Sequence, residues 1–598
     1  MKGRRTVLVL VLAGMCLVAG AAVLGVTSIP DWRLKVLAAA AAAMATFGAG
    51  IVPVWLTAVV EKRHQYEAAR AQSIFMIGGK PPLVQDISDA LSTGVHASAR
   101  GARGDRIPPY VLRDADPALR QALNHSGFVL LSGAAAVGKT RTAFEAIRAV
   151  LPHHVFISPK GIAEVPEAMR AAGQERHCVL WLDNLQRYLG GSAISSAGIA
   201  ELLSGKGHHR VVVATLRAAE ESRLIAMAGS PSGGQLMRDG QAVLDLADRI
   251  VIERMFTTQE RERVASLAIQ DARLASALRH ANEYGIAEYL SSGPQLHTEW
   301  ENAWERGAHP RGAALIAAAV DCRLAGFAAP LSRSLLDELH QEYLDRGGGM
   351  RLRPEPLNDA WAWATQLRDS GNSPLWLGER DSYHVFDYLV DVLAARQVPV
   401  PESTVRTALR FADSADALVI GATAWYQGRR ELAVAGFRRT YAELRRTKGP
   451  DEPATLASRS DLAVTLYALG RLPDAETEYR EILDRRTAIL GPHHPDTLAS
   501  RNNLAVLFHH ERRLAEAEAE YRAVLSDRTR ALGPEHPDTL VTRNNLGVVL
   551  MHTGRLDEAE AELKQVVELR EQVLGPDHPV TEMSRGNLET VRRMRLAQ

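Results

Sequence analysis

The sequence has few cysteines, few aromatic residues and no excess of charge of either sign. Its three cysteines, Cys16, Cys178 and Cys322, lie far apart in the 598 residues. They can form neither a disulfide framework nor a zinc cluster, so a small disulfide-stabilised scaffold and a zinc finger are excluded. Lys plus Arg and Asp plus Glu number 70 each. Because no overall charge attracts phosphate polymers, we expect no nucleic-acid partner.

Charge is also missing from two long runs near the amino terminus. Thr6–Thr27 contains 22 residues without a charge, and Val36–Val60 contains 25. Either run is long enough to cross a bilayer as a helix, which takes about 20 apolar residues. Basic residues flank the outer ends of the pair, so the positive-inside rule predicts a hairpin with both ends in the cytoplasm. A cleaved signal peptide is the alternative for the first run.

A glycine-rich turn lies between a predicted strand and a predicted helix. Phe128–Ser132 is a short apolar strand pattern, and Gly133–Thr140 reads GAAAVGKT. Arg141–Val150 follows with apolar residues on one side of a helix. Strand, G-x-x-x-x-G-K-[ST] turn and helix together are the pattern of a P-loop, which binds the phosphates of a nucleotide.

The residue types of this turn suit that chemistry. Gly133 and Gly138 allow the backbone to direct N–H groups at phosphate oxygens, and the helix N-terminus adds partial positive charge. Lys139 is expected to neutralise the β- and γ-phosphates, and the Thr140 hydroxyl to bind Mg²⁺. The predicted cofactors are therefore ATP and Mg²⁺.

Two further strand patterns end in polar residues. Cys178–Leu182 leads into Asp183, 44 residues after the P-loop lysine, where a P-loop protein places the carboxylate that organises Mg²⁺. Arg210–Ala214 leads into Thr215 and Arg217, which we expect to contact the γ-phosphate. The alternative for all three is that they are ordinary residues of strand-to-helix loops.

Asn184 follows the predicted metal carboxylate, where many P-loop ATPases have a second acidic residue that polarises the attacking water. An amide orients water by hydrogen bonding but cannot take up its proton. Asp183 and Asn184 are the catalytic candidates, and they predict slow ATP hydrolysis or binding without turnover.

The carboxyl-terminal third repeats with a period of 42 residues. Each unit begins at a Gly-Pro dipeptide and contains two helical patterns, of which the second carries a small residue and a large one four positions later. The dipeptides start at Gly449, Gly491, Gly533 and Gly575, and the small–large pairs are Ala475/Tyr479, Ala517/Tyr521 and Ala559/Leu563. This period and helix pairing predict a solenoid of tetratricopeptide type.

Two columns of polar residues recur on the first helix of each unit. Two positions along a helix differ by about 200°, so the columns face different ways. Asparagine has both a donor and an acceptor, and an Asn column can bind the backbone of an extended peptide or hydrogen-bond between adjacent helices. The columns are Arg459, Arg501, Arg543 and Arg585, and Asp461, Asn503, Asn545 and Asn587.

Both halves resemble known families. The segments GAAAVGKT, VLWLDN and VVVATLR resemble the STAND class of signal-transducing P-loop ATPases, relatives of AAA+ proteins. Leu490–Thr497 and Arg501–Ala505 resemble the repeats of kinesin light chains. These resemblances imply a nucleotide-gated switch with a helical or winged-helix section and a superhelical repeat sensor. They also imply a preference for ATP, and an Asn column that faces a groove and binds a protein segment.

We therefore expect a membrane-anchored, ATP-dependent signalling switch, a slow P-loop ATPase that senses or recruits a protein partner through its repeats and self-associates with nucleotide. The alternative is a non-enzymatic membrane scaffold whose P-loop binds nucleotide but hydrolyses it weakly. Asn184 argues against a third function, a motor-like remodeller.

The predicted fold class is multidomain, with two transmembrane α-helices, an α/β P-loop NTPase core, a helical middle region and an all-α solenoid of tetratricopeptide repeats. Residues 6–60 are expected to contact the plasma membrane of a multi-pass protein whose NTPase and repeat domains are cytoplasmic. The expected domains are a transmembrane hairpin over 1–61, a connector over 62–105, the NTPase over 106–255, a helical, winged-helix-like region over 256–412 and the solenoid over 413–598.

Overall fold

The computed structural model describes residues 73–597, with gaps at 96, 99–104, 163, 190–193, 206, 229–234, 370, 379–380 and 577–578. The chain divides into two compact units. One comprises Met1–Pro81 and Ile157–Ala171, in which the described backbone forms a bridge between Ile74 and Pro159. The other comprises Pro82–Phe156 and Ala172–Gln598 and contains every site described below.

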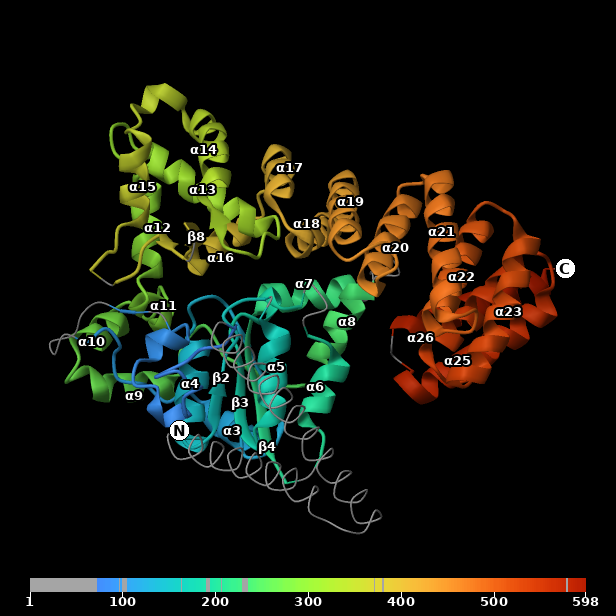
Figure 1. Ribbon diagram of the computed structural model, residues 1–598, viewed down its shortest axis with the longest axis horizontal. Coiled ribbons are helices and arrows are strands. Elements are labelled where there is room, and N and C mark those ends of the chain that lie inside the picture. The colour runs from blue at the N-terminus through green and yellow to red at the C-terminus, as the bar shows by residue number, and fades with distance from the viewer. Residues whose placement is uncertain are drawn as a thin grey trace, which may run out of the picture. The chain divides into compact units, whose positions relative to one another are not determined.

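A five-stranded sheet forms the first part of the larger unit. Its strand order is β2-β3-β4-β1-β5, and β4 runs parallel to both of its neighbours, β3 and β1. The strands β1, β3 and β4 are rich in Val and Leu and almost wholly buried, as expected for parallel strands covered on both faces, whereas the edge strand β5 is mostly exposed. The strands are β1 (Gly127–Gly133), β2 (Val155–Ile157), β3 (His177–Leu182), β4 (His209–Arg217) and β5 (Ala247–Val251). The helices of this part are α3 (Asp116–Ala122), α4 (Lys139–Val150), α6 (Ser196–Leu203), α7 (Ala218–Ala228) and α8 (Gln235–Leu244) (Figure 1). Most of α5 (Val165–Gln174) belongs to the first unit.

The register of the sheet brings the polar ends of three strands to one edge. Gly133 of β1 lies opposite Arg217 of β4, and Leu182 of β3 lies opposite Ala214 of β4. Because these strands are parallel, the residues that follow β1 and β3 lie beside the last residues of β4. The register therefore fixes where the predicted phosphate and metal residues meet.

Helices and one small sheet make up the middle of the chain. The helix α13 (Pro310–Leu324) is buried along nearly its whole length, because most of its residues are small or apolar. A three-stranded antiparallel sheet has the order β6-β8-β7, with β6 (Leu331–Ser332), β7 (Leu375–Leu377) and β8 (Ser382–Val385). The other helices are α9 (Thr258–Ala268), α10 (Ala272–Arg279), α11 (Ile286–Leu290), α12 (Gly293–Asn302), α14 (Arg333–Gly347), α15 (Leu357–Thr365), α16 (Asp387–Ala395) and α17 (Glu402–Phe411).

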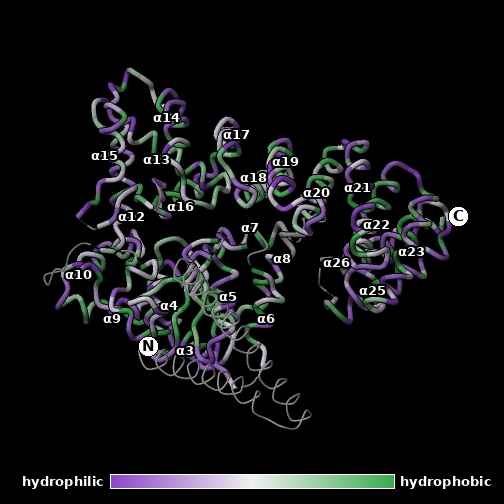
Figure 2. Tube along the Cα trace, in the orientation of Figure 1, coloured by the Kyte–Doolittle hydropathy of each residue, from purple (hydrophilic) through white to green (hydrophobic). Residues whose placement is uncertain are grey.

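The predicted repeats are confirmed as helical hairpins that follow one another along the chain (Figure 1). The first helix of each full unit starts at a proline, whose missing N–H costs nothing at this position. Each helix shows both apolar and polar residues along its trace in Figure 2, and the predicted small–large pairs are buried. The helices are α18 (Ser414–Tyr426), α19 (Arg430–Thr447), α20 (Pro453–Ala468), α21 (Leu472–Leu490), α22 (Pro495–His510), α23 (Leu514–Leu532), α24 (Pro537–His552), α25 (Leu556–Leu574) and α26 (Pro579–Leu596).

Two sets of arginines join the helices of this array. The predicted Arg column pairs within a hairpin, since Arg459, Arg501 and Arg543 each contact a glutamate 19 residues later on the second helix. A second set on the second helices donates to the first helix of the next unit. Arg528, for example, donates to the Asp538 carbonyl at 2.8 Å and to the Thr542 hydroxyl at 2.7 Å. Arg486 and Arg570 make the equivalent bonds.

The prediction of transmembrane helices needs correction. In the part of the chain that the structure describes, no helix is both long enough and apolar enough to cross a membrane. The long helices of the array carry charged faces, and the apolar α13 has only 15 residues, against the roughly 20 that a span needs. The runs Thr6–Thr27 and Val36–Val60 lie outside the described residues. The fold class is corrected to a mostly helical protein with tetratricopeptide-like repeats and a small parallel sheet, and the multi-pass plasma-membrane location is unsupported.

The second arginine set makes a prediction about stability. Arg528→Ala removes two hydrogen bonds from a buried junction between units, so we expect the free energy of unfolding of the array to fall by about 2–3 kcal/mol. The matched control is Arg530→Ala, whose side chain is 72% exposed and pairs with Asp527. The control should change stability by less than about 0.5 kcal/mol in urea denaturation. Equal losses in the two variants would contradict the assignment.

Candidate functional site

The predicted phosphate loop connects β1 to α4. Gly138 precedes the helix with a φ of +97°, a conformation that side-chain-bearing residues adopt at a cost. The Lys139 ammonium donates to the carbonyls of Gly133, at 2.9 Å, and Ala134, at 2.6 Å, and so lies across the loop. Burial lowers the pKa of Lys139 to about 8. Burial removes water from the Lys139 ammonium, so an anionic ligand beside it would stabilise its charged form.

Asp183 joins two of the predicted site residues. Its Oδ1 accepts from the Thr140 hydroxyl at 2.9 Å and from the Thr215 hydroxyl at 2.7 Å. Thr215 is buried and its hydroxyl orients the carboxylate, while its contact with a γ-phosphate stays a prediction. Carboxylate and hydroxyl oxygens are the hard ligands that Mg²⁺ prefers, so the donor set at Thr140 and Asp183 fits this ion.

The backbone conformation at position 184 explains why this residue is an asparagine. Its φ is +59°, in the left-handed region where asparagine is enriched among residues other than glycine. Its N–H donates to the Thr215 hydroxyl at 2.9 Å. The side chain lines the cavity described next, so an amide occupies the position beside the metal carboxylate.

A cavity of about 430 Å³ opens over the loop. This is the size of a site for a small ligand. One part of its wall is apolar and comes from the segment before β1 and from α11. Another part is charged and comes from the ends of β3 and β4, from β8 and from α4, α7, α13 and α16. The apolar wall includes Ile107, Pro108, Pro109, Val111, Ile286 and Leu290, and the polar wall includes Lys139, Thr140, Asp183, Arg217, Glu220, Arg223, Arg323, His384 and Asp387.

Arg217 lies in the charged part of the wall, and its contact with a γ-phosphate stays a prediction. Its guanidinium contacts Asp391 of α16 at 3.3 Å and Glu220 at 3.2 Å. Desolvation lowers the pKa of Arg217, but the charges of Asp387, Glu220 and Asp391 outweigh it and hold that pKa above its usual range. The site thus includes residues from the helical middle region, where the sequence pattern gave no chemistry-bearing motif.

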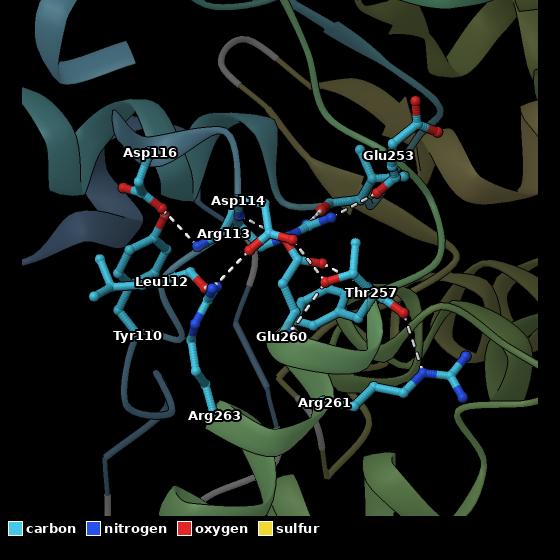
Figure 3. Close-up of polar contacts among 12 residues, drawn as sticks. Tyr110, Leu112, Arg113, Asp114, Asp116, Glu253, Thr257, Glu260, Arg261 and Arg263 are labelled. Carbon is cyan, nitrogen blue, oxygen red and sulfur yellow. Dashed lines mark hydrogen bonds and ion pairs between the residues drawn. The ribbon is translucent and has the colours of Figure 1, made fainter. Parts of the chain in front are cut away.

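A buried arginine anchors the apolar wall (Figure 3). Arg113 donates to the carboxylate of Glu260 at 2.9 Å, to the carbonyl of Val137 in the phosphate loop at 3.1 Å, and to the carbonyl of Glu253 at 2.7 Å. Its guanidinium also lies 4.0 Å from the centre of the Phe256 ring. One side chain therefore ties the segment before β1 to the loop, to the residues after β5 and to α9.

The segment predicted to be a connector reaches the metal-binding candidates. Trp181 of β3 donates from its indole to the carbonyl of Thr93 at 3.2 Å. At the next residue, Gly94, an added Cβ would lie 2.6 Å from Oδ2 of Asp183. Glycine is needed there because any side chain would displace that carboxylate. Gly94, Arg113, His384 and Asp391 are site residues that the sequence analysis missed.

The Asn column divides between two environments. Asn545 of α24 hydrogen-bonds to Tyr521 of α23, and Asn587 of α26 donates to Asn544 at 3.3 Å. Both contacts join one unit to the preceding one. Asn503 is half-buried and has no hydrogen-bond partner among the described residues. Of the three, it is the one available to another molecule.

Comparisons with known proteins identify the repeats. Models of the tetratricopeptide repeat family match residues 413–488, 461–525 and 501–551, and a further one matches 539–580. The chain therefore contains tetratricopeptide repeats, which are typical of protein–protein interaction. A search of curated proteins gave no match.

Several solved structures are similar to this chain. A putative kinesin light chain with nearly identical TPR-like repeats from Podosopora anserina is 24% identical over 30% of this chain and 85% of its own, with a TM-score of 0.27. BtubC (BKLC) from P. vanneervenii is 18% identical over 35% of this chain and 85% of its own, with a TM-score of 0.26. A STAND protein with a tetratricopeptide repeat sensor from Pyrococcus horikoshii is 11% identical over 82% of this chain and 81% of its own, with a TM-score of 0.24.

The anchor at Arg113 gives a second testable prediction. Arg113→Ala leaves the buried carboxylate of Glu260, 3% exposed, without its cation, and we expect the free energy of unfolding to fall by about 3–5 kcal/mol. The control Arg263→Ala removes an arginine that is 37% exposed and pairs with Asp114. Its loss should cost less than about 1 kcal/mol in the same chemical denaturation experiment. A control as damaging as Arg113→Ala would refute the anchor.

Proposed function

We propose that this protein is an ATP-dependent switch that senses or recruits a protein partner through its tetratricopeptide repeats. The observation that carries the proposal is the meeting of Lys139, Thr140 and Asp183 at the floor of a cavity with one apolar and one charged wall. A nucleotide has an apolar base and a charged phosphate chain, and this division of the cavity suits both. The ordinary role of tetratricopeptide repeats in protein interaction supports the partner.

The residues divide the binding work by their chemistry. The N–H groups of the loop and the Lys139 ammonium would bind phosphate oxygens, and Thr140 and Asp183, which already contact each other, would hold Mg²⁺. The metal, when bound, neutralises phosphate charge. Thr215 keeps Asp183 oriented, and the apolar wall excludes water from the base.

Hydrolysis is expected to be slow. Asn184 cannot accept a proton, and Glu220, a carboxylate in the cavity wall, is paired with Arg217 and Arg223. The proposal includes nucleotide-dependent self-association. It is tested by measuring the molecular mass of the protein in solution with and without nucleotide.

The alternative is a scaffold that binds nucleotide as a structural ligand. The amide of Asn184 favours this alternative, since a site without a general base can bind ATP without hydrolysing it. Turnover separates the two: a scaffold shows none, and a switch shows slow hydrolysis that responds to a partner.

The nucleotide site makes the third prediction. Full-length Lys139→Ala should lose Mg²⁺-dependent ATP binding by at least about tenfold in calorimetry, because the phosphate counter-charge is removed. Asp183→Ala should weaken only the Mg²⁺-dependent part, and Asn184→Asp should raise turnover. Lys564→Ala, an exposed lysine of α25, is the matched control and should bind as the wild type does. Binding that persists in Lys139→Ala would refute the site.

The groove makes the fourth prediction. If the first helices bind a protein segment, Asn503→Ala should weaken capture of an isolated partner severalfold without changing the melting temperature. Asn545→Ala removes a contact to Tyr521 and should lower the melting temperature. If Asn503→Ala lowers the melting temperature and leaves capture intact, the column is structural.

A further inference from the structure

Three histidines meet at the edge of the five-stranded sheet that is opposite to the phosphate loop. His154 comes directly before β2, His177 is the first residue of β3 and His209 is the first residue of β4, and these strands are neighbours in the sheet. Nε2 of His154 lies 3.0 Å from Nδ1 of His209, and the centres of the two rings are 4.8 Å apart. The ring of His177 packs edge-on against that of His154, with 5.4 Å between centres. The cluster therefore joins the starts of three strands.

The short contact between His154 and His209 requires one ring to donate a hydrogen and the other to accept it. The Nε2 atom of His209 is buried and has no hydrogen-bond partner among the described residues. If His209 donates from Nδ1, this Nε2 carries no hydrogen. If His209 accepts, Nε2 carries a hydrogen that meets no acceptor. The first arrangement is favoured, because a buried N–H group without an acceptor is the rarer case in folded proteins.

A further proton has no favourable place in this pair. On His209 it would bind Nε2, where it would be buried without an acceptor. On His154 it would bind Nε2, so that two N–H groups would face each other across 3.0 Å. Burial, together with the charges that His209, His177 and His153 carry when protonated, lowers the pKa of His154 to about 4. The fold therefore stabilises the neutral cluster.

Other charged and titratable side chains lie at this edge of the sheet and belong to the elements packed around the cluster. They are His125 before β1, Glu175 and Arg176 before β3, His208 and Arg210 on either side of His209, and Asp86 on the segment paired with β2. Arg210 donates to backbone carbonyls at the ends of α5 and α6, and Asp86 accepts from the backbone of its own turn. Among the described residues, none of the three clustered histidines forms an ion pair with a carboxylate, which would favour its charged form.

The cluster also holds a segment from earlier in the chain. The carbonyl of His154 accepts from the N–H of Val84 at 3.0 Å, and the N–H of Phe156 donates to the carbonyl of Pro82 at 2.8 Å. The ring and the carbonyl of His154 belong to one residue. A movement of this ring away from His209 therefore moves the turn to which the earlier segment is bonded.

We propose that His154, His177 and His209 form a pH-sensitive contact that holds residues 82–85 on β2 at neutral pH and releases them when the cluster takes up a proton. A histidine in the open form takes up a proton near pH 6.5, whereas His154 in the closed cluster does so only near pH 4. The open form therefore binds more protons, so the contact is stable above about pH 6.5 and is lost progressively as the pH falls toward 4. This contact does not depend on a nucleotide.

The fifth prediction uses the backbone amides of Val84 and Phe156 as reporters of the contact. In the full-length wild type, their hydrogen-exchange protection factors should fall about fivefold between about pH 7.5 and about pH 5.5. The full difference between 6.5 and 4 would give about tenfold, and solvent that reaches the half-buried ring reduces this effect. In His154→Gln, whose amide takes the place of Nε2 but does not take up a proton, the same factors should change by less than about twofold.

His125→Gln is the matched control, because His125 is exposed at the same edge and its side chain has no hydrogen-bond partner among the described residues. It should keep the wild-type fall in protection. His209→Asn removes the other member of the pair and should abolish the fall as His154→Gln does, so the test survives if one of the two variants folds poorly. Protection in the wild type that does not change with pH, or a fall that persists in both His154→Gln and His209→Asn, would overturn the role of the cluster.

Discussion

The site depends on the two hydrogen bonds that Asp183 accepts from Thr140 and Thr215. These three side chains come from the ends of β3 and β4 and from the start of α4, so one carboxylate links the strands to the phosphate loop. A carboxylate with a fixed orientation is a ready ligand for a hard cation. The parallel register of β1, β4 and β3 is what makes the contact possible.

The same physical solution holds the remaining parts. A buried guanidinium donates to more than one acceptor at once at Arg113 in the site and at Arg486, Arg528 and Arg570 in the array. In each case the arginine joins segments that are separate in sequence or belong to different repeats. Buried donors and acceptors need hydrogen-bond partners. Because a guanidinium has five N–H donors, one arginine can bond to acceptors on two different segments.

Much of the site could be predicted because its residues follow a local rule. Lys139 and Thr140 lie in a continuous motif, and Asp183 and Thr215 each follow a buried strand pattern. Arg113 and Asp391 could not be found in this way. Arg113 pairs with Glu260 across 147 residues, and Asp391 reaches Ala135 across 256. Neither lies in a pattern with its partner, so only the folded chain shows that a lone arginine or aspartate belongs to the site.

The repeat array shows the same division. The sequence by itself determined the helical hairpins, their 42-residue period and their buried small–large pairs, because each depends on residues within one unit. Tertiary structure decided which asparagines face neighbouring helices, since the contact of Asn545 with Tyr521 joins two units. It also decided that Asp391 meets the phosphate loop. A local periodicity can be recognised in the sequence itself, whereas a contact between distant segments forms only once both have packed against the same core.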